Sequence, residues 1–439
     1  MLPEIVSRIP GPRSRSLAKE LAQWESQNVT FLSEQFPVFW ERAEGSNVWD
    51  VDGNCFLDFT SAFGVSNLGH APPKIVAALQ KQAAALPHAM GDVHPTESKV
   101  RLCRQLSAIT FERWSPHLKA KTILCNSGSE AIEAALKTAL IATGKPGILS
   151  FEGAYHGLGH GALEVSGLDY FRAPFRPQLG QFGISVPFPK NENFPAILQK
   201  IETALTTQKI GAILTEPIQG RGGERVPPPD FLPGLRRLCD KHNILLIIDE
   251  IFTGFNRTGT LFACEQSGTL PDLICLGKGL SSLFPISACV GLQKHMDAWP
   301  KSDGEALHTS TFLGNPMGCA AALESIRLHL RPETQQAVHT SAEILRSSLS
   351  RINSPAISEI RGAGLLIGIE LRSHKKMSAT ELATGFITYA LQRGLLVLTS
   401  GSNSEVISLS PPFFMSKSEL CLLGETLQEY LTSRLGSIS

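Results

Sequence analysis

Short runs of consecutive apolar residues alternate with longer amphipathic stretches through the middle of the chain. The runs lie at residues 121–125, 147–151, 211–215, 244–248, 272–276 and 286–291. Runs that are apolar throughout are typical of parallel strands buried on both faces, and amphipathic stretches such as 231–242 predict helices between them. The alternation therefore predicts an α/β fold, with a mostly parallel sheet covered by helices. After Pro316 a long helical pattern and a glycine-punctuated strand pattern at 361–371 indicate a smaller α+β domain.

Two of the predicted strands bring a polar side chain to the same edge of the sheet. Asp249 follows the run 244–248, and Lys278 follows the run 272–276. This carboxyl edge is where open α/β folds bind their ligands. A carboxylate and an amine there indicate pyridoxal phosphate, because the amine can form a Schiff base with the aldehyde and the carboxylate can keep the pyridine nitrogen protonated. Taken alone, Lys278 is more simply a solvated loop lysine.

A helix start next to this edge suits a phosphate group. Residues 126–131, Asn-Ser-Gly-Ser-Glu-Ala, follow the run 121–125 and open a helical pattern that Gly144 closes. Free backbone amides and the positive end of the helix dipole point toward whatever binds there. An ordinary helix N-cap has much the same sequence, so this motif alone leaves both interpretations open.

Six motifs taken together resemble, in order and spacing, the class III aminotransferases, which are pyridoxal-phosphate enzymes of fold type I. The motifs lie at residues 126–131, 154–157, 215–220, 249–259, 276–279 and 309–316. The resemblance runs from about Pro10 to the final helix and is strongest to the branch of 4-aminobutyrate and acetylornithine aminotransferases. It implies a large cofactor-binding domain at 61–313, and a small α+β domain built from an N-terminal segment, 1–60, and a C-terminal segment, 314–439.

The resemblance also implies the roles of four residues around the cofactor ring. Lys278 would form the Schiff base and then move a proton between substrate and cofactor, while Asp249 would pair with the pyridine nitrogen. Tyr155 would lie on one face of the ring and Ile251 on the other, which excludes water. The plainer interpretation of Tyr155 is a half-buried core tyrosine.

Three further residues are implied to hold the phosphate. Gly128 and Ser129 would bind it at the helix start, and in the family a threonine from the second subunit, here Thr311, completes the site. Sharing the site in this way implies a homodimer with two shared active sites.

The residues implied to face the substrate depart from the family pattern. Where the family has an arginine that binds the α-carboxylate, this chain has Ser408, which cannot supply the two-pronged charged grip of a guanidinium. Glu216, the usual partner of that arginine, could then attract an amine, or it could simply cap the turn that begins at Pro217. Arg225 and Arg42 are possible replacements for the missing arginine.

A second departure lies beside Asp249. Phe252 stands where the family usually has a glutamine that contacts the ring hydroxyl of the cofactor. The change removes one hydrogen bond, with a usual net value of about 1 kcal/mol.

We expect an aminotransferase that moves an amino group from an amine or ω-amino compound to an oxo acid through a Schiff base on Lys278. The alternative is a racemase or epimerase of an amino compound on the same scaffold, since some relatives that isomerise amino compounds also lack the arginine at position 408. A non-catalytic descendant is a third possibility, which the presence of both Lys278 and Asp249 disfavours.

Composition narrows the partners and the compartment. With 40 basic and 40 acidic residues the net charge is zero, and no basic block indicates nucleic acid or an acidic membrane surface. No apolar run is long enough to span a bilayer, and the N-terminus lacks the hydrophobic core of a secretory signal, so we expect a cytoplasmic enzyme. The nine cysteines include no C-x-x-C pair, which favours reduced core cysteines and no metal site.

Overall fold

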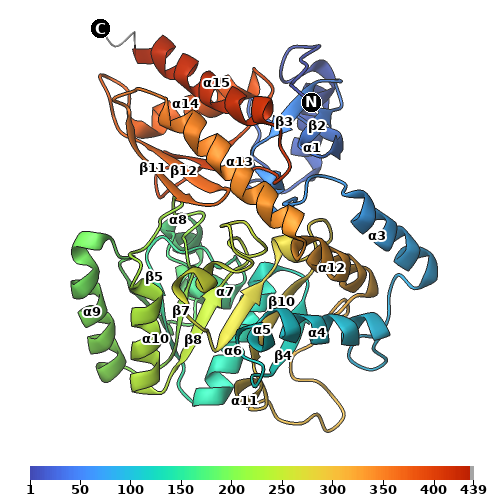
Figure 1. The fold of residues 1–439 in the computed structure, drawn as a ribbon, viewed down its shortest axis with the longest axis vertical. Coiled ribbons are helices and arrows are strands. Elements are labelled where there is room, and N and C mark those ends of the chain that lie inside the picture. The colour runs from blue at the N-terminus through green and yellow to red at the C-terminus, as the bar shows by residue number, and fades with distance from the viewer. Residues whose placement is uncertain (436–439) are drawn as a thin grey trace. The chain divides into compact units, whose positions relative to one another are not determined.

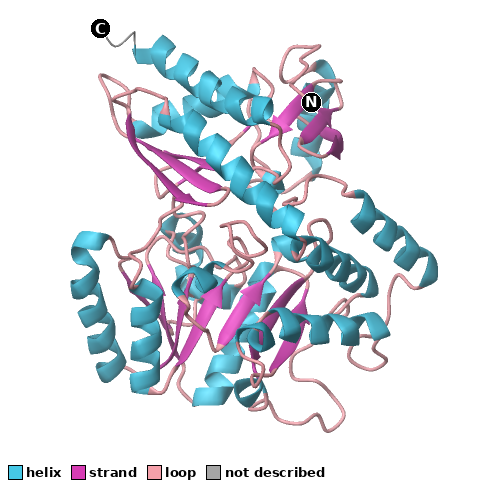
Figure 2. Cartoon of the chain, viewed as in Figure 1, coloured by secondary structure: helices cyan, strands magenta, loops and turns pink. Residues whose placement is uncertain are grey.

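The chain forms two compact units in a computed structural model that describes residues 1–435 of 439. Unit 1 contains Met1–Pro72 and the chain from Gln336 on, and unit 2 contains Pro73–Gln335. Helix α13 (Pro332–Ser350) runs across the second boundary. Figure 1 shows the course of the chain, and Figure 2 shows its helices and strands.

A seven-stranded sheet forms the centre of unit 2, with the order β4-β10-β9-β8-β7-β5-β6. Its strands are β4 (Ala120–Cys125), β5 (Gly147–Phe151), β6 (Gly183–Val186), β7 (Ile210–Thr215), β8 (Leu245–Asp249), β9 (Leu273–Leu276) and β10 (Ser287–Leu292). The pairs β6/β5, β5/β7, β7/β8 and β8/β9 are parallel, whereas β10 is antiparallel to both β9 and β4. The predicted mostly parallel sheet is confirmed, and β6 is a strand that the apolar pattern did not predict.

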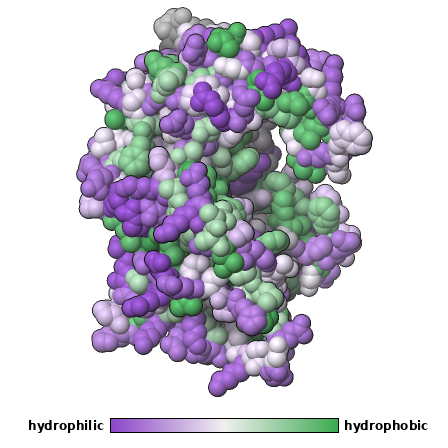
Figure 3. Space-filling model, turned by 90° about the vertical axis from the view of Figure 1, so that its right-hand side faces the viewer, coloured by the Kyte–Doolittle hydropathy of each residue, from purple (hydrophilic) through white to green (hydrophobic). Residues whose placement is uncertain are grey.

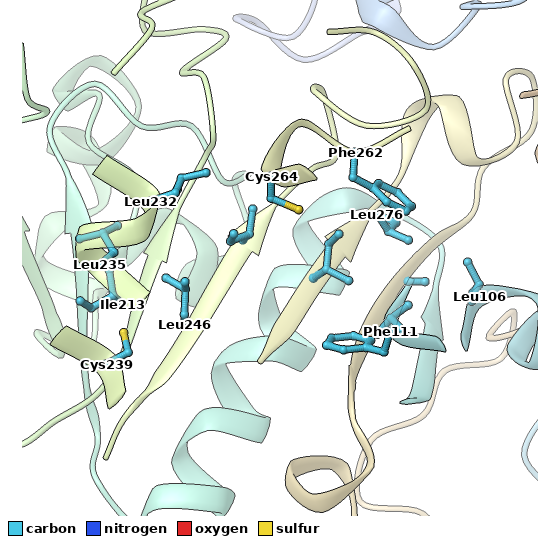
Figure 4. Close-up of a cluster of buried hydrophobic side chains, with 14 of the residues drawn as sticks. Leu106, Phe111, Ile213, Leu232, Leu235, Cys239, Leu246, Phe262, Cys264 and Leu276 are labelled. Carbon is cyan, nitrogen blue, oxygen red and sulfur yellow. The ribbon is translucent and has the colours of Figure 1, made fainter. Parts of the chain in front are cut away.

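Both faces of this sheet are buried, which explains why its strands are apolar throughout. Along β8, Leu246 and Ile248 belong to one buried cluster, and Leu245 and Ile247 belong to another on the opposite face. The first cluster includes side chains of helices α4 (Glu97–Ile109), α9 (Phe194–Thr207), α10 (Phe231–His242) and α12 (Pro316–His329); Figure 4 shows part of it. The second cluster packs under helix α6 (Gly128–Thr143).

The other helices of unit 2 are short or peripheral. They are α3 (Pro73–Ala85), α5 (Phe111–Trp114), α7 (His160–Glu164), α8 (Asp169–Arg172) and α11 (Gln293–Met296), with 3-10 turns η1 (Ala173–Gln178), η2 (Asn191–Asn193), η3 (Ala263–Ser267) and η4 (Lys278–Leu280). Helix α12 lies beyond residue 313 but belongs to unit 2, because it packs against α3 and α4.

Unit 1 joins the two ends of the chain in an α+β arrangement. One sheet has the order β1-β2-β3-β13 and the other β11-β12-β15-β14. The strands are β1 (Trp40–Glu44), β2 (Asn47–Asp50), β3 (Cys55–Asp58), β11 (Ile357–Ala363), β12 (Leu366–Leu371), β13 (Leu395–Leu396), β14 (Leu398–Ser400) and β15 (Val406–Leu409); the helices are α1 (Pro12–Trp24), α2 (Ser61–Gly64), α14 (Ala379–Leu391) and α15 (Lys417–Leu435). Because β13 pairs with β3, a C-terminal strand completes an N-terminal sheet.

The described residues contain free cysteines but no disulfide, membrane-spanning helix or metal-binding cluster. All nine cysteines are free, and all but Cys103 and Cys421 are buried. Within residues 1–435 no helix has the length and apolar character required to cross a membrane, and no group of three or more histidine, cysteine, aspartate or glutamate side chains could hold a metal ion. On the face shown in Figure 3, hydrophobic residues are scattered among hydrophilic ones.

Candidate active site

The sheet of unit 2 brings most of the candidate residues to one edge. Asp249 is the last residue of β8 and lies opposite Cys275 of β9 in the parallel register. Gly277 and Lys278 follow directly after β9, so the carboxylate and the amine come from neighbouring strands at the same carboxyl edge.

Asp249 is held by a histidine and by its own turn. It is buried, with 3% of its surface exposed, and its Oδ2 lies 2.8 Å from Nδ1 of His156. Its Oδ1 accepts a hydrogen bond of 3.0 Å from the backbone N–H of Ile251. The Nε2 atom of His156 is buried and has no hydrogen-bond partner among the described residues. The two bonds fix the orientation of the carboxylate.

Lys278 lies in a strained and half-buried position. Its φ of 44° is in the left-handed region, which is costly for a residue with a Cβ and is found most often where function requires it. Burial lowers the pKa of its amine, and Arg257 lowers it further, while Asp249 and Glu216 raise it. Its Nζ lies 4.4 Å from the centroid of the Phe252 ring.

The start of helix α6 lies against the turn after β8 and the loop after β5. Ser127 caps the helix by accepting a hydrogen bond of 3.3 Å from the N–H of Glu130. A Cβ on Gly128 would lie 3.0 Å from Cδ1 of Ile251, which is closer than ordinary van der Waals contact. Only a glycine therefore fits at this position without displacing Ile251. The hydroxyl of Ser129 accepts a hydrogen bond of 2.9 Å from the N–H of Gly159. Gly128, Ser129 and Ile251 are thus brought together at a helix N-terminus.

Glu216 connects two loops of the site. It follows β7, is 6% exposed, and accepts hydrogen bonds of 3.1 Å from the N–H groups of Tyr155 and Gly220. Burial raises its pKa to about 7; the neighbouring His156 opposes that shift and the charge of Asp249 adds to it. The bond to Gly220 is the turn cap that the sequence allowed as the simpler interpretation.

Tyr155 is half-buried beside this carboxylate. Its ring packs edge-on against that of Phe171, with 5.5 Å between the centroids. Burial raises the pKa of its hydroxyl, and the charge of Arg221 partly offsets the shift. Tyr155 belongs to the loop after β5, which is fixed by the hydrogen bonds from Tyr155 to Glu216 and from Gly159 to Ser129.

Thr311 is exposed in a loop of unit 2. The hydroxyl of its neighbour Ser310 accepts a hydrogen bond of 3.3 Å from the side-chain amide of Asn126, just before helix α6. Thr309 donates a hydrogen bond of 2.8 Å to Asp92. These contacts place the loop near the helix start of its own chain.

Ser408 lies in unit 1 and is described within that unit only. It sits in the centre of β15, between Gly368 of β12 and Leu398 of β14. Its neighbours Ile407 and Leu409 are part of the unit 1 core, so alternation points Ser408 to the other face of the sheet.

The two arginines considered as replacements each have a local contact, Arg42 through its side chain and Arg225 through its backbone. The guanidinium of Arg42 stacks 3.5 Å above the ring of Trp49 in unit 1. In unit 2, Arg225 exchanges backbone hydrogen bonds of 3.0 and 3.1 Å with Gln219. Neither contact involves a candidate catalytic residue.

Two side chains of the site were not assigned contacts from the sequence. His156 follows Tyr155 directly, but no spacing rule links it to Asp249, which is 93 residues away. Phe252 was noted only for the amide it lacks, whereas its ring faces the amine of Lys278. Contacts of this kind depend on strand order, which a single sequence does not contain.

Comparisons with known proteins identify the family to which the chain is similar. The family model described as aminotransferase class-III matches residues 30–431. A 5-aminovalerate aminotransferase of Pseudomonas aeruginosa is 35% identical over 398 residues, which cover 88% of this chain and 91% of the relative. A 4-aminobutyrate aminotransferase of Escherichia coli is 34% identical over 416 residues, with coverages of 92% and 95%.

Solved structures give the same result. An amine transaminase from an uncultivated Pseudomonas species, in its pyridoxal-phosphate-bound form, superimposes with a TM-score of 0.83 at 27% identity, covering 94% of this chain and 99% of its own. An (S)-enantioselective omega-transaminase from Thermomicrobium roseum has a TM-score of 0.86 at 26% identity, with coverages of 96% and 99%. This chain therefore belongs to the class-III aminotransferase family, enzymes that transfer amino groups with pyridoxal phosphate.

Proposed function

We propose that Lys278 is the residue that bonds to pyridoxal phosphate and that Asp249 is the partner of its pyridine nitrogen. The observation that carries the proposal is their placement after neighbouring parallel strands, at one edge and beside the start of helix α6. The amine can react with the aldehyde of the cofactor, and the buried carboxylate can pair with its ring nitrogen. The helix N-terminus can bind its phosphate. The residues present therefore fit the group.

Each residue has a distinct task in this proposal. Bound pyridoxal phosphate supplies an aldehyde that condenses with amines and a ring that withdraws electrons from the substrate carbon. Lys278 takes a proton from that carbon and returns one during amino-group transfer. Asp249, oriented by His156, keeps a proton on the ring nitrogen. Tyr155 and Ile251 cover the two ring faces and exclude water.

The phosphate site follows from the helix start. Gly128 and Ser129 offer backbone N–H groups at the positive end of the helix dipole, and Gly128 has no side chain to block the approach. Because a phosphate carries negative charge, the positive end of the helix dipole stabilises it there. Thr311 adds its hydroxyl from a second subunit.

We infer that the donor is an amine or ω-amino compound and that the acceptor is an oxo acid. Relatives named for 5-aminovalerate and 4-aminobutyrate support an ω-amino donor. Ser408 supports a site without the charged clamp that favours α-amino acids. Amino-group transfer is the activity for which these relatives are named, and the racemase or epimerase alternative gains no support from them.

The proposal includes a cytoplasmic homodimer. Two loops of unit 2 expose large apolar side chains: Leu86, Met90 and Val93 on one, and Leu307 and Phe312 on the other. The loops contact each other through a hydrogen bond from Asn315 to the carbonyl of Pro87 and through the rings of His88 and Phe312. Exposed apolar side chains on two loops that contact each other are typical of a subunit interface.

The test uses the purified protein loaded with pyridoxal phosphate. Borohydride should attach the cofactor permanently to the peptide that contains Lys278, and 4-aminobutyrate or 5-aminovalerate with 2-oxoglutarate or pyruvate should give transfer. Lys278→Ala should prevent the attachment and lower kcat by at least about 10² to 10⁴, the usual contribution of a general acid and base. Lys200→Ala, on the exposed side of helix α9, is the matched control and should change neither result.

Two outcomes would contradict the proposal. Peptide mapping that finds the reduced cofactor on another lysine would remove Lys278 from its role. Isomerisation of a chiral amine without any acceptor, together with no transfer to either oxo acid, would favour the racemase.

A further inference from the structure

The amine of the half-buried Lys278 lies over the ring of Phe252, which is half-buried as well. Its Nζ is 4.4 Å from the centroid of the Phe252 ring, within the range of a cation–π interaction. The negative face of the ring attracts an ammonium group, and the attraction strengthens where solvent is excluded. Phe252 therefore stabilises Lys278 when its amine is protonated.

The ring is fixed in this position by the turn after β7. A Cβ on Gly220 would lie 2.3 Å from Cδ1 of Phe252, so the ring packs directly on the backbone of Gly220. Gly220 in turn donates its N–H to Glu216. With Gly220 on one side and Lys278 on the other, the ring has little freedom to move.

The charges around Lys278 have opposing effects on the protonation of its amine. Asp249 and Glu216 favour the protonated amine, whereas Arg257 and burial disfavour it. The Phe252 ring attracts the ammonium group through its π face and carries no charge of its own, so it adds to the effect of these groups without a further negative charge.

We propose that Phe252 is a positioning residue for amino-group transfer: its ring face holds the amino group of Lys278 whenever that amine is not bonded to the cofactor. The proposal rests on the proposed role of Lys278 and deepens it. During transfer Lys278 is released and must stay beside the substrate carbon to move a proton. A ring that attracts the protonated lysine keeps the ammonium group of Lys278 at the site, together with the proton that Lys278 returns.

The experiment measures the protonation of Lys278 in enzyme loaded with pyridoxamine phosphate, in which the lysine is not bonded to the cofactor. Acetic anhydride modifies only the neutral amine, and mass spectrometry of the Lys278 peptide gives the rate. The rate at pH 7 is divided by the plateau rate at high pH. The ratio cancels differences in accessibility, because these change the rate equally at every pH.

Phe252→Leu removes the ring face but keeps an apolar side chain, and should raise this ratio about fivefold, the effect of losing about 1 kcal/mol of cation–π attraction. Phe252→Tyr keeps the face and should leave the ratio unchanged. Gly220→Ala displaces the ring but keeps Phe252, Lys278 and the backbone N–H that Glu216 accepts. In a Glu216→Gln background, which removes the charge of this carboxylate, it should still raise the ratio as Phe252→Leu does. Phe194→Leu, a half-buried phenylalanine at the start of α9, is the control and should leave it unchanged.

A ratio that stays at the native value in both Phe252→Leu and Gly220→Ala would overturn the proposal. Because two separate substitutions disturb the same ring, loss of folding in one still leaves the other to decide. Borohydride mapping of Lys278 is an independent measurement, so failure of this inference can be told from failure of the proposed function.

Discussion

At the scale of single residues, Glu216 shows how burial sets the chemistry of the site. From the sequence, this carboxylate could either attract an amine or cap the turn that begins at Pro217. In the structure both of its oxygens accept backbone hydrogen bonds, from Tyr155 and Gly220, and burial raises its pKa to about 7. Near neutral pH the group is therefore partly protonated, and it ties two loops together.

Glu216 should make stability depend on pH. The native protein binds this proton up to about pH 7, whereas the unfolded chain releases it near 4.5, so the native state becomes less stable as pH rises between these values. Relative to Glu216→Gln, the free energy of unfolding of the native sequence should fall by up to about 3 kcal/mol from pH 4.5 to 7 and stay level above. Urea unfolding of both proteins across this range measures the difference.

The comparison isolates one carboxyl group. Glu250 is also buried, with a pKa raised to about 7, but it is present in both proteins and its contribution cancels. Glu250→Gln is the matched variant and should show the same trend against the native sequence. A difference between native and Glu216→Gln that is constant with pH would mean that Glu216 is charged throughout.

At the scale of elements, the start of helix α6 depends on glycines in the loop after β5. Gly157 has a φ of 117°, and a Cβ there would lie 2.6 Å from Cβ of Ser129. Ser129 also bonds Gly159, so this loop lies directly on the helix N-terminus. Any side chain at position 157 must push the loop away from the proposed phosphate site.

Gly157→Ala should therefore weaken retention of pyridoxal phosphate by about tenfold or more, or about 1.4 kcal/mol in binding. Gly144→Ala is the matched control, because Gly144 also has a positive φ, of 66°, but has nothing within 4 Å of the added Cβ. Both substitutions should cost at least about 1 kcal/mol in backbone strain, and more at Gly157, whose φ lies outside the small left-handed α region, but only Gly157→Ala should lose cofactor during gel filtration. Equal retention of pyridoxal phosphate in the two variants would show that this loop does not contribute to cofactor binding.

The same elements show what could be predicted from the sequence. The apolar spacing after residue 127 predicted helix α6, and Gly144 predicted its end, because both signals are local; the structure shows that Gly144 is left-handed. Strand β6, only Gly183–Val186 and mostly half-buried, has no continuous apolar run and was missed. The glycine-punctuated pattern at 361–371 is a hairpin of β11 and β12, whose turn contains Gly364 with a φ of 53°.

The left-handed turn at Ser61–Gly64 was also beyond sequence analysis. Ser61, Ala62 and Phe63 have φ values of 46°, 47° and 62°, which residues with a Cβ seldom adopt. Asp58 holds the turn by accepting hydrogen bonds from the N–H groups of Thr60 and Ala62. Such a conformation is imposed by its surroundings, so no local signal could indicate it.

At the scale of the whole molecule, the pairing of distant segments depends on interactions that no local pattern records. Strand β13 has only two residues, Leu395 and Leu396, yet it completes the N-terminal sheet by pairing with Leu57 and Asp58. The two segments are far apart in the sequence, so the spacing of apolar residues could not predict that they pair. Only the family resemblance implied a domain made of both ends of the chain. The pattern of apolar residues in one chain likewise cannot show how two chains assemble. The position of Thr311 offers a way to test whether two chains share their active sites.

Thr311 could act on either of two sites. Its exposure and the apolar loops beside it support a role in the partner subunit, whereas the hydrogen bond between Ser310 and Asn126 brings the loop near the helix start of the same chain. Complementation between two impaired variants, at a pyridoxal phosphate concentration too low to saturate Thr311→Ala, distinguishes these possibilities. Lys278→Ala lacks the reacting amine, and Thr311→Ala lacks the hydroxyl for the phosphate.

If Thr311 serves the partner, a hybrid dimer of the two variants has one intact site, formed by Lys278 of one chain and Thr311 of the other. Random reassociation makes about half of the dimers hybrids, so the mixture should recover about a quarter of the sites of the native enzyme. If Thr311 serves its own chain, the chain with Lys278 still lacks its threonine and mixing restores nothing. Transfer activity and borohydride-fixed cofactor, measured after the two variants are unfolded and refolded together, count the restored sites. The same variants refolded separately and then combined are the control, since they form no hybrids, and activity no higher than this control would contradict the shared site.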